Sequence, residues 1–122
     1  MKRKILVVDD DPAIIKLLEF YLMSSGFEVL TAQNGEEFRQ KAFTEKPDVI
    51  VLDIMLGETD GAVLYQDLLL EGLSSKTPVV FLSALAHDIS PTPPRPGRTY
   101  SLLGKPFDPE QLAEKIACLV QA

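Results

Sequence analysis

The chain has 122 residues, of which 46% are hydrophobic and 25% are charged, and this size and composition predict one compact domain spanning residues 1–122. The net charge of −6 argues against direct binding of nucleic acid, which needs clustered lysine and arginine, and the single cysteine excludes an internal disulfide. The longest apolar runs, such as VIVL at 49–52, are too short to cross a membrane, and the apolar stretch near the N-terminus is too short for a signal peptide, so we expect a cytoplasmic protein.

The first predicted unit is a buried strand followed by an amphipathic helix. Residues 4–8 form a short, partly β-branched apolar run of the kind found in strands that are buried on both faces. Asp11 then suits a helix N-cap and Pro12 the first helical position, while Gly26 can end the helix in a left-handed conformation. The predicted apolar face of this helix consists of Ile14, Leu17, Leu18, Tyr21 and Leu22.

The alternation of strand and helix then recurs twice. A strand is predicted over 27–31, and Asn34 opens the helix that follows it. The run DVIVLD over 48–53 is the strongest strand signal in the chain, and a loop that includes Gly57 and Gly61 leads from it into another helix. The residues predicted to face the core on these two helices are Phe38 and Ala42 on the first, and Val63, Leu64, Leu68 and Leu69 on the second.

The last third of the chain departs from this rhythm. A continuous apolar strand is predicted over 78–83, but the prolines between 88 and 98 disfavour a regular helix, so we expect an irregular loop there. A short fifth strand over 100–103 and a final helix capped by Asp108 complete the pattern, and Cys118 is expected in the core. The buried stripe predicted for the final helix consists of Leu112, Ala113, Ile116, Leu119 and Val120.

Strands that alternate with helices predict parallel pairing through right-handed crossovers. We therefore expect a three-layer, flavodoxin-like α/β fold with a five-stranded parallel sheet in the order 2-1-3-4-5, and with the fourth helix missing or replaced by the proline-rich loop. In this order the first and third strands are neighbours, and their carboxyl ends carry Asp9, Asp10 and Asp53. Open α/β sheets bind ligands at this edge, which predicts the place of the site.

Three carboxylates at one sheet edge would repel each other unless a cation lay among them. Oxygen ligands without a nearby cysteine or histidine favour a hard ion, and Mg²⁺ commonly takes one or two carboxylates with waters and a phosphate oxygen. We expect Asp10 and Asp53 to bind Mg²⁺ directly, the backbone carbonyl of Met55 to add a third oxygen, and Asp9 to orient a bound water.

The same arrangement suits phosphoryl transfer, in which a protein mainly positions the nucleophile and neutralises charge on the transferred group. Asp53 is the candidate nucleophile, and the fourth and fifth strands end near a hydroxyl at Ser83 and an ammonium at Lys105 that could contact phosphoryl oxygens. Taken singly, the aspartates could be a solvated turn, and Ser83 and Lys105 ordinary surface residues. Their combination at the ends of four strands favours the functional interpretation.

Five short motifs carry a resemblance to a known family: ILVVDDDP at 5–12, VIVLDIML at 49–56, DG at 60–61, VVFLSA at 79–84 and GKPF at 104–107. Over its whole length the chain resembles the CheY-like receiver domain of two-component response regulators. The resemblance implies that Asp53 accepts a phosphoryl group from a sensor histidine kinase or a phosphotransfer protein. It further implies that Asp9 and Asp10 form the acidic pair at Mg²⁺, that Ser83 is the switch hydroxyl, and that Lys105 contacts the phosphate. A downstream effector protein or an attached output domain would then receive the signal.

The sequence departs from the family pattern at three places. Gly57 stands where the family usually has proline, and Leu102 replaces the usual aromatic switch residue. The proline-rich segment occupies the place of the fourth helix, which is normally part of the face that changes on phosphorylation. We therefore expect an atypical output face formed by residues 88–99 and the last helix.

Two other functions compete with phosphorylation-dependent signalling. One alternative is a degenerate receiver that acts as a phosphorylation-independent protein-interaction module, which the departure at the fourth helix favours and the intact Asp53 and Lys105 disfavour. The other is a Mg²⁺-dependent aspartyl phosphatase, but such enzymes generally carry a second aspartate two residues after the nucleophile, where this chain has Met55. We therefore expect a signalling domain rather than an enzyme.

Overall fold

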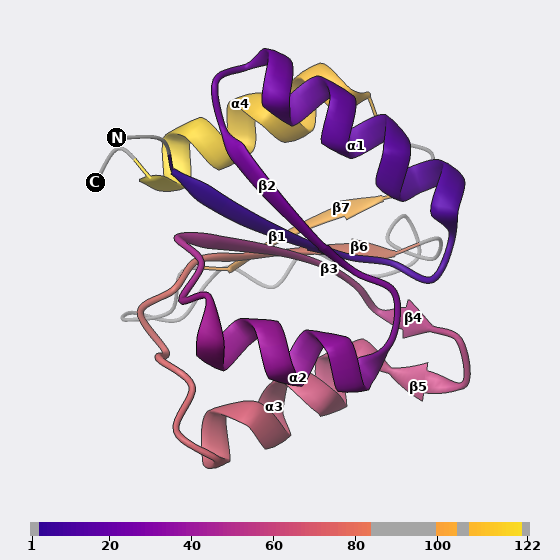
Figure 1. Ribbon diagram of the computed structural model, residues 1–122, viewed down its shortest axis with the longest axis vertical. Coiled ribbons are helices and arrows are strands. Elements are labelled where there is room, and N and C mark those ends of the chain that lie inside the picture. Colours follow the sequence, from indigo (N-terminus) through magenta and orange to yellow (C-terminus); the bar gives the residue numbers. More distant parts are fainter. Residues whose placement is uncertain (1–2, 84–99, 105–107, 121–122) are drawn as a thin grey trace.

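The computed structural model describes residues 3–83, 100–104 and 108–120 (Figure 1). Its larger sheet contains five strands and is flanked by helices, and a short hairpin follows the third of these strands. The strands of the larger sheet are β1 (Lys4–Val8), β2 (Glu28–Ala32), β3 (Val49–Asp53), β6 (Val79–Ser83) and β7 (Tyr100–Gly104). The hairpin pairs β4 (Met55–Leu56) with β5 (Thr59–Asp60), and the helices are α1 (Pro12–Ser24), α2 (Gly35–Thr44), α3 (Gly61–Leu70) and α4 (Pro109–Val120).

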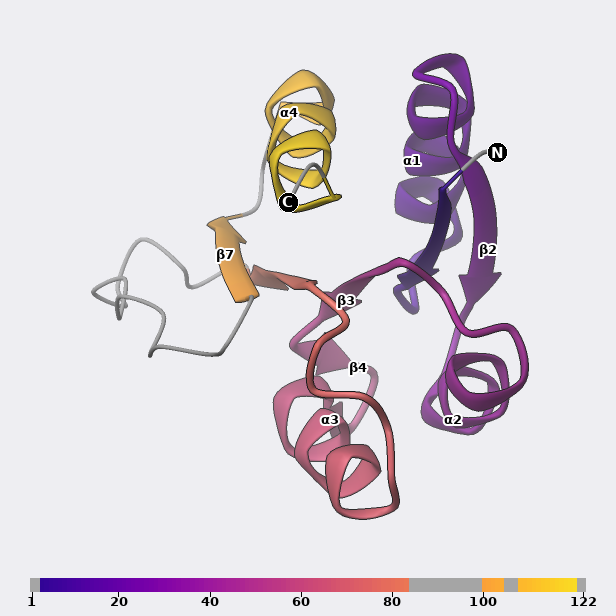
Figure 2. The ribbon, with the colours of Figure 1, turned by 90° about the vertical axis from the view of Figure 1, so that its left-hand side faces the viewer.

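All neighbouring strands of the large sheet run parallel, in the order β2-β1-β3-β6-β7. This order confirms the predicted 2-1-3-4-5 arrangement, because the strand numbers differ only by the inserted hairpin. Helices α1 and α4 cover one face of the sheet, while α2 and α3 cover the other (Figures 1 and 2). The protein therefore has the three-layer, flavodoxin-like α/β architecture predicted from the sequence.

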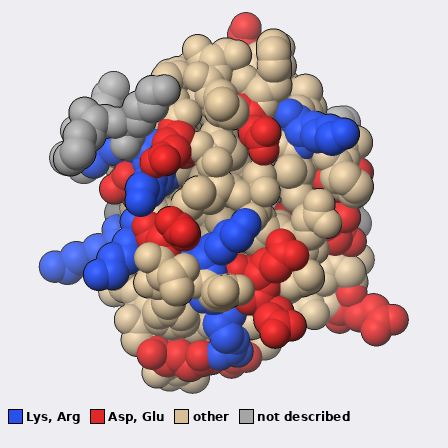
Figure 3. Space-filling model, viewed as in Figure 1, with Lys and Arg blue, Asp and Glu red and all other residues tan. Residues whose placement is uncertain are grey.

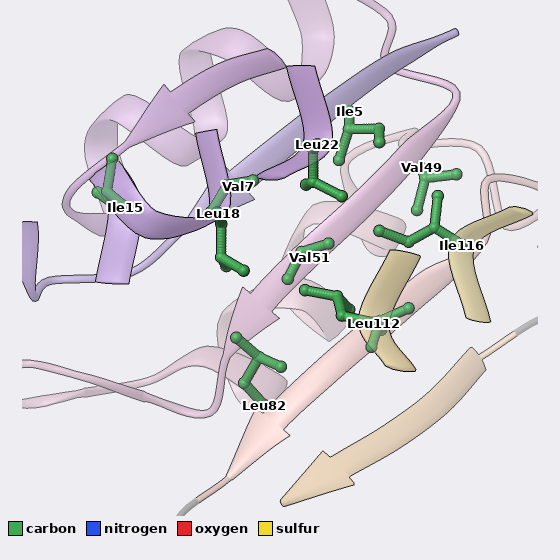
Figure 4. Packing of buried hydrophobic residues seen from close by; sticks show 11 residues of the cluster. Ile5, Val7, Ile15, Leu18, Leu22, Val49, Val51, Leu82, Leu112 and Ile116 are labelled. Carbon is green, nitrogen blue, oxygen red and sulfur yellow. The ribbon is translucent and has the colours of Figure 1, made fainter. Parts of the chain in front are cut away.

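The core has two halves, one on each face of the sheet. Successive side chains of a strand point to opposite faces, so Ile5 and Val7 of β1 pack toward α1 and α4 (Figure 4). Leu6 and Val8 pack toward α2 and α3. All five residues of β3, the central strand, are buried. A strand buried on both faces has no alternation of apolar and polar residues, which explains the continuous apolar run in the sequence.

Polar side chains begin the helices at the predicted positions. Asp11 Oδ1 accepts a hydrogen bond from the Ala13 amide at 2.9 Å, and Asn34 Oδ1 accepts one from the Glu37 amide at the same distance. Asp108 caps α4 in the same way through the Glu110 amide. These bonds satisfy backbone donors that the first turn of a helix leaves without a partner.

Several predictions about individual faces and ends were wrong. Leu17 of α1 was predicted to face the core but is 41% exposed, whereas Ile15, which was not predicted, is only 5% exposed. The helix turns Ile15, Leu18 and Leu22 toward the sheet. Val63 of α3 is also exposed, and so is Cys118, which points away from the core stripe of α4. Strand β2 begins one residue later than predicted, at Glu28.

Two further predictions concern other parts of the chain. Gly61 does not lie in a loop but is the first residue of α3. The prediction that residues 88–98 form an irregular loop in place of a helix concerns residues outside the described ranges. Among the helices of the described ranges, none combines the length and the apolar character that crossing a membrane requires.

Candidate metal and phosphoacceptor site

The site lies where β1 and β3 end side by side. The register of this parallel pair places Val8 opposite Leu52, so Asp9, which follows β1, reaches the same edge as Asp53, the last residue of β3. The chain leaves these two neighbouring strands in opposite directions, toward helices on opposite faces (Figure 2). Such a switch point creates a crevice beyond the carboxyl ends of the strands, as the sequence predicted.

The structure brings the three predicted carboxylates together. One carboxylate oxygen each from Asp9, Asp10 and Asp53 lies within 4.8 Å of the others. Asp9 and Asp53 are buried, with 0% and 4% of their surface exposed, while Asp10 is exposed and faces the solvent. This set of donors consists only of hard oxygen ligands and opens to solvent on one side, so it fits Mg²⁺ with several retained waters.

Backbone amides fix all three carboxylates. Asp9 Oδ1 accepts a hydrogen bond from the Asp11 amide at 2.9 Å, and Asp53 Oδ1 accepts one from the Met55 amide at 3.1 Å. Asp10 Oδ2 accepts a hydrogen bond from the Gly57 amide, also at 3.1 Å. These bonds partly offset the mutual repulsion of the acids, and they set the directions in which the carboxylates point.

Of the other predicted site residues, the structure describes Ser83 and Met55 but not Lys105. Ser83 is the last residue of β6, is buried, and follows Leu82, which the sheet register aligns with Asp53. Met55 begins β4, and its amide contacts the Asp53 carboxylate as described above. Lys105 comes directly after β7 in the chain but lies outside the described residues.

Sequence reasoning missed the part played by two glycines near the acids. Gly61 is buried, and a Cβ atom at this position would lie 2.2 Å from the main-chain oxygen of Asp53. Gly57 has a φ of +62° and donates to Asp10 from the turn between β4 and β5. The motif DG at 60–61 was a visible signal for the first glycine, whereas nothing in the local sequence pairs Gly57 with Asp10.

Comparison with known proteins assigns the chain to a family. The family model for the response regulator receiver domain matches residues 5–117. The chain therefore belongs to the receiver domains of two-component response regulators.

Curated relatives include several transcriptional regulators. The chain is 36% identical over 121 residues to the alkaline phosphatase synthesis transcriptional regulatory protein PhoP of Bacillus subtilis, a match that covers 99% of this chain and 50% of the relative. It is 32% identical over 118 residues to the DNA-binding dual master transcriptional regulator RpaA of Synechocystis, covering 97% and 49%. The chain thus spans about half the length of the curated relatives that it matches.

Solved structures agree with the assignment. The receiver domain of the Francisella response regulator 1452 superposes with a TM-score of 0.81 at 28% identity, with 98% of each chain covered. The chemotaxis protein CheY4 of Vibrio cholerae gives a TM-score of 0.81 at 26% identity, covering 98% of this chain and 99% of that chain. Both matches extend over nearly the whole receiver fold.

Proposed function

We propose that this receiver domain, spanning residues 1–122, accepts a phosphoryl group on Asp53 in a reaction that depends on Mg²⁺. The observation that carries the proposal is the convergence of Asp9, Asp10 and Asp53 at the ends of two neighbouring strands, with two of the acids buried. Three carboxylate oxygens at such short range favour a cation among them, because like charges repel. Asp10, Asp53 and the Met55 carbonyl would hold Mg²⁺, and Asp9 would orient one of its waters.

The proposed reaction transfers the phosphoryl group from a phosphohistidine of a sensor histidine kinase or a phosphotransfer protein. A carboxylate oxygen of Asp53 attacks the phosphorus, the bond from phosphorus to the imidazole nitrogen breaks, and that nitrogen keeps the electron pair and takes up a proton. The product is an aspartyl phosphate. Bound Mg²⁺ would neutralise charge on the phosphoryl oxygens during the transfer.

The chain's own residues would position and stabilise the transferred group. The Met55 amide holds one oxygen of Asp53, which orients the carboxylate. Ser83, at the end of the next strand, would donate its hydroxyl to a phosphoryl oxygen, and Lys105, which follows β7 in the chain, would supply a positive charge. These are binding and positioning roles in a signalling reaction rather than the turnover of a separate substrate.

The output proposed here is atypical for the family. Phosphorylation adds charge and acceptor oxygens beside Ser83 and favours one of two conformations of the domain. Because Leu102 replaces an aromatic switch residue and prolines fill the segment after β6, we propose that residues 88–99 and α4 form the output face. An effector protein or an attached output domain would read this face.

We further propose that the domain acts in the cytoplasm and does not itself bind nucleic acid. The net charge is −6, and on the face shown in Figure 3 lysine and arginine side chains are interspersed with aspartate and glutamate. Nucleic-acid binding would instead require a contiguous basic patch. Under this proposal, DNA binding by a regulator such as RpaA would belong to the half of that protein that this chain does not match.

The proposal is tested by intact-protein mass spectrometry after incubation with acetyl phosphate and Mg²⁺. We expect the wild-type chain to gain the mass of one phosphoryl group, and we expect no gain for Asp53→Asn or when EDTA replaces Mg²⁺. Asp11→Asn is the matched control, because asparagine also caps a helix and Asp11 lies beside the acidic cluster without joining it. An unmodified wild-type chain would contradict the proposal and favour a degenerate receiver that signals without phosphorylation.

A further inference from the structure

The turn between β4 and β5 reaches back to the acidic cluster through a single backbone amide. The Gly57 N–H donates to Asp10 Oδ2 at 3.1 Å, across 47 positions of sequence. Asp10 is the exposed member of the cluster, whereas Asp9 and Asp53 are buried. The amide therefore contacts the one carboxylate of the three that is exposed to solvent.

We propose that Gly57 is a positioning residue for the bound cation, acting through Asp10. This inference rests on the proposed Mg²⁺ site. An exposed carboxylate that rotates freely loses side-chain entropy when it binds an ion, and a hydrogen bond formed beforehand removes part of that loss. The Gly57 amide engages Oδ2, so Oδ1 can bind a cation without breaking the bond.

The conformation of the turn explains why glycine serves this purpose. Gly57 has a φ of +62°, a left-handed conformation that glycine adopts without strain, and a Cβ there would meet no atom within 4 Å. Proline, the usual residue of the family here, has no N–H to donate and fixes φ near −65°, so the bond to Asp10 is an addition of this chain that a proline would remove. Asparagine tolerates the left-handed region and retains the N–H.

Both ends of the hairpin are also hydrogen-bonded to residues at or just after the end of β3. The Met55 amide donates to Asp53 Oδ1 at 3.1 Å, and the Gly61 amide donates to the Ile54 carbonyl at 2.6 Å. The antiparallel pairing of Met55 with Asp60 and of Leu56 with Thr59 joins these two anchors. The turn is thus held beside Asp10 by contacts with Asp53 and Ile54 that do not require the cation.

The test compares Mg²⁺ affinity, measured by isothermal titration calorimetry, among variants of the full chain. Loss of an outer partner of a metal ligand commonly weakens metal binding tenfold or more, so we expect Gly57→Pro to weaken Mg²⁺ binding by about tenfold. Gly57→Asn is expected to rescue wild-type affinity. Gly57→Ala keeps the N–H and adds only backbone strain, so it should lower the urea midpoint while Mg²⁺ affinity stays near that of wild type.

The matched control is Gly72→Pro, because Gly72 has a φ of +111° and follows α3 at the other end of that helix from the acids. It should lower stability and leave Mg²⁺ affinity unchanged. Equal affinity of wild type and Gly57→Pro, or an equal loss in Gly57→Ala and Gly57→Pro, would overturn the inference and leave the Mg²⁺ site standing. Failure of the wild type to bind Mg²⁺ would overturn both.

A second measurement does not depend on how the proline variant folds. The Gly57 amide of the wild type should stay protected from hydrogen exchange when Mg²⁺ saturates the site, because the inference holds that the bond and the cation coexist. Loss of protection on saturation would mean that the cation displaces the bond, which would overturn the inference.

Discussion

At position 61, next to the acidic cluster, the backbone leaves no room for a side chain. Gly61 is the first residue of α3, and a Cβ atom there would lie 2.2 Å from the Asp53 oxygen and 3.3 Å from the Ile54 Cα, both of them backbone atoms. Backbone of a buried central strand cannot move aside as a side-chain tip can. The absence of a side chain at 61 therefore lets α3 begin directly against the end of β3.

We predict that Gly61→Ala lowers the free energy of unfolding by about 1–3 kcal/mol, the usual effect of forcing extra volume into a packed site. The control is Gly35→Ala, because a Cβ at 35 would meet only the Leu64 Cδ2 atom, at 2.9 Å, and a side-chain tip can rotate away. That control should stay within about 1 kcal/mol of wild type. Urea unfolding measures both variants, and equal effects would refute the special role of position 61.

The three acidic residues could be predicted from the sequence, but the glycines that support them could not. Asp9, Asp10 and Asp53 each follow a strongly apolar run, so the strand ends are visible in the sequence and the topology brings them together. The contact of Gly57 with Asp10 depends on a hairpin whose strands have two residues each. A strand of two residues is too short to show the alternation of apolar and polar side chains that reveals longer strands.

At the scale of elements, the N-terminal caps of α1, α2 and α4 were predicted more accurately than the face that α1 turns toward the core. Capping depends on a few neighbouring residues, and the caps at Asp11, Asn34 and Asp108 are all present. Helix α1 is apolar on more than one side, and its exposed apolar residues include Phe20 at 69% and Met23 at 57%. The sequence pattern therefore allowed several rotations of this helix, and only packing against the sheet selects one of them.

Helix α3 offers a matched pair that tests the observed face. Leu68 is fully buried, whereas Leu70, two positions later, is 88% exposed. Leu68→Ala should lower the free energy of unfolding by about 2–5 kcal/mol, as expected for a cavity in a packed core. Leu70→Ala should change it by no more than about 0.5 kcal/mol. Equal losses of unfolding free energy in the two variants, measured with urea, would show that Leu68 does not face the core as the structure has it.

At the scale of the whole molecule, the alternation of strands and helices determined the architecture. Parallel pairing through right-handed crossovers leaves few possible orders, and the observed order follows from them. The same order sets β1 beside β3, so Asp53 meets Asp9 and Asp10, which lie 44 and 43 positions earlier in the sequence, because of topology rather than local preference. The site is thus a consequence of the fold, with the hairpin and its glycines adjusting the carboxylates.

The most direct test of the central claim is a crystal structure of the chain with Mg²⁺ and beryllofluoride, a stable mimic of a phosphoryl group. We predict that the beryllium binds a carboxylate oxygen of Asp53 and that Mg²⁺ contacts both Asp10 and Asp53. A beryllofluoride group bound elsewhere, or a Mg²⁺ ion that does not touch these two carboxylates, would contradict the claim.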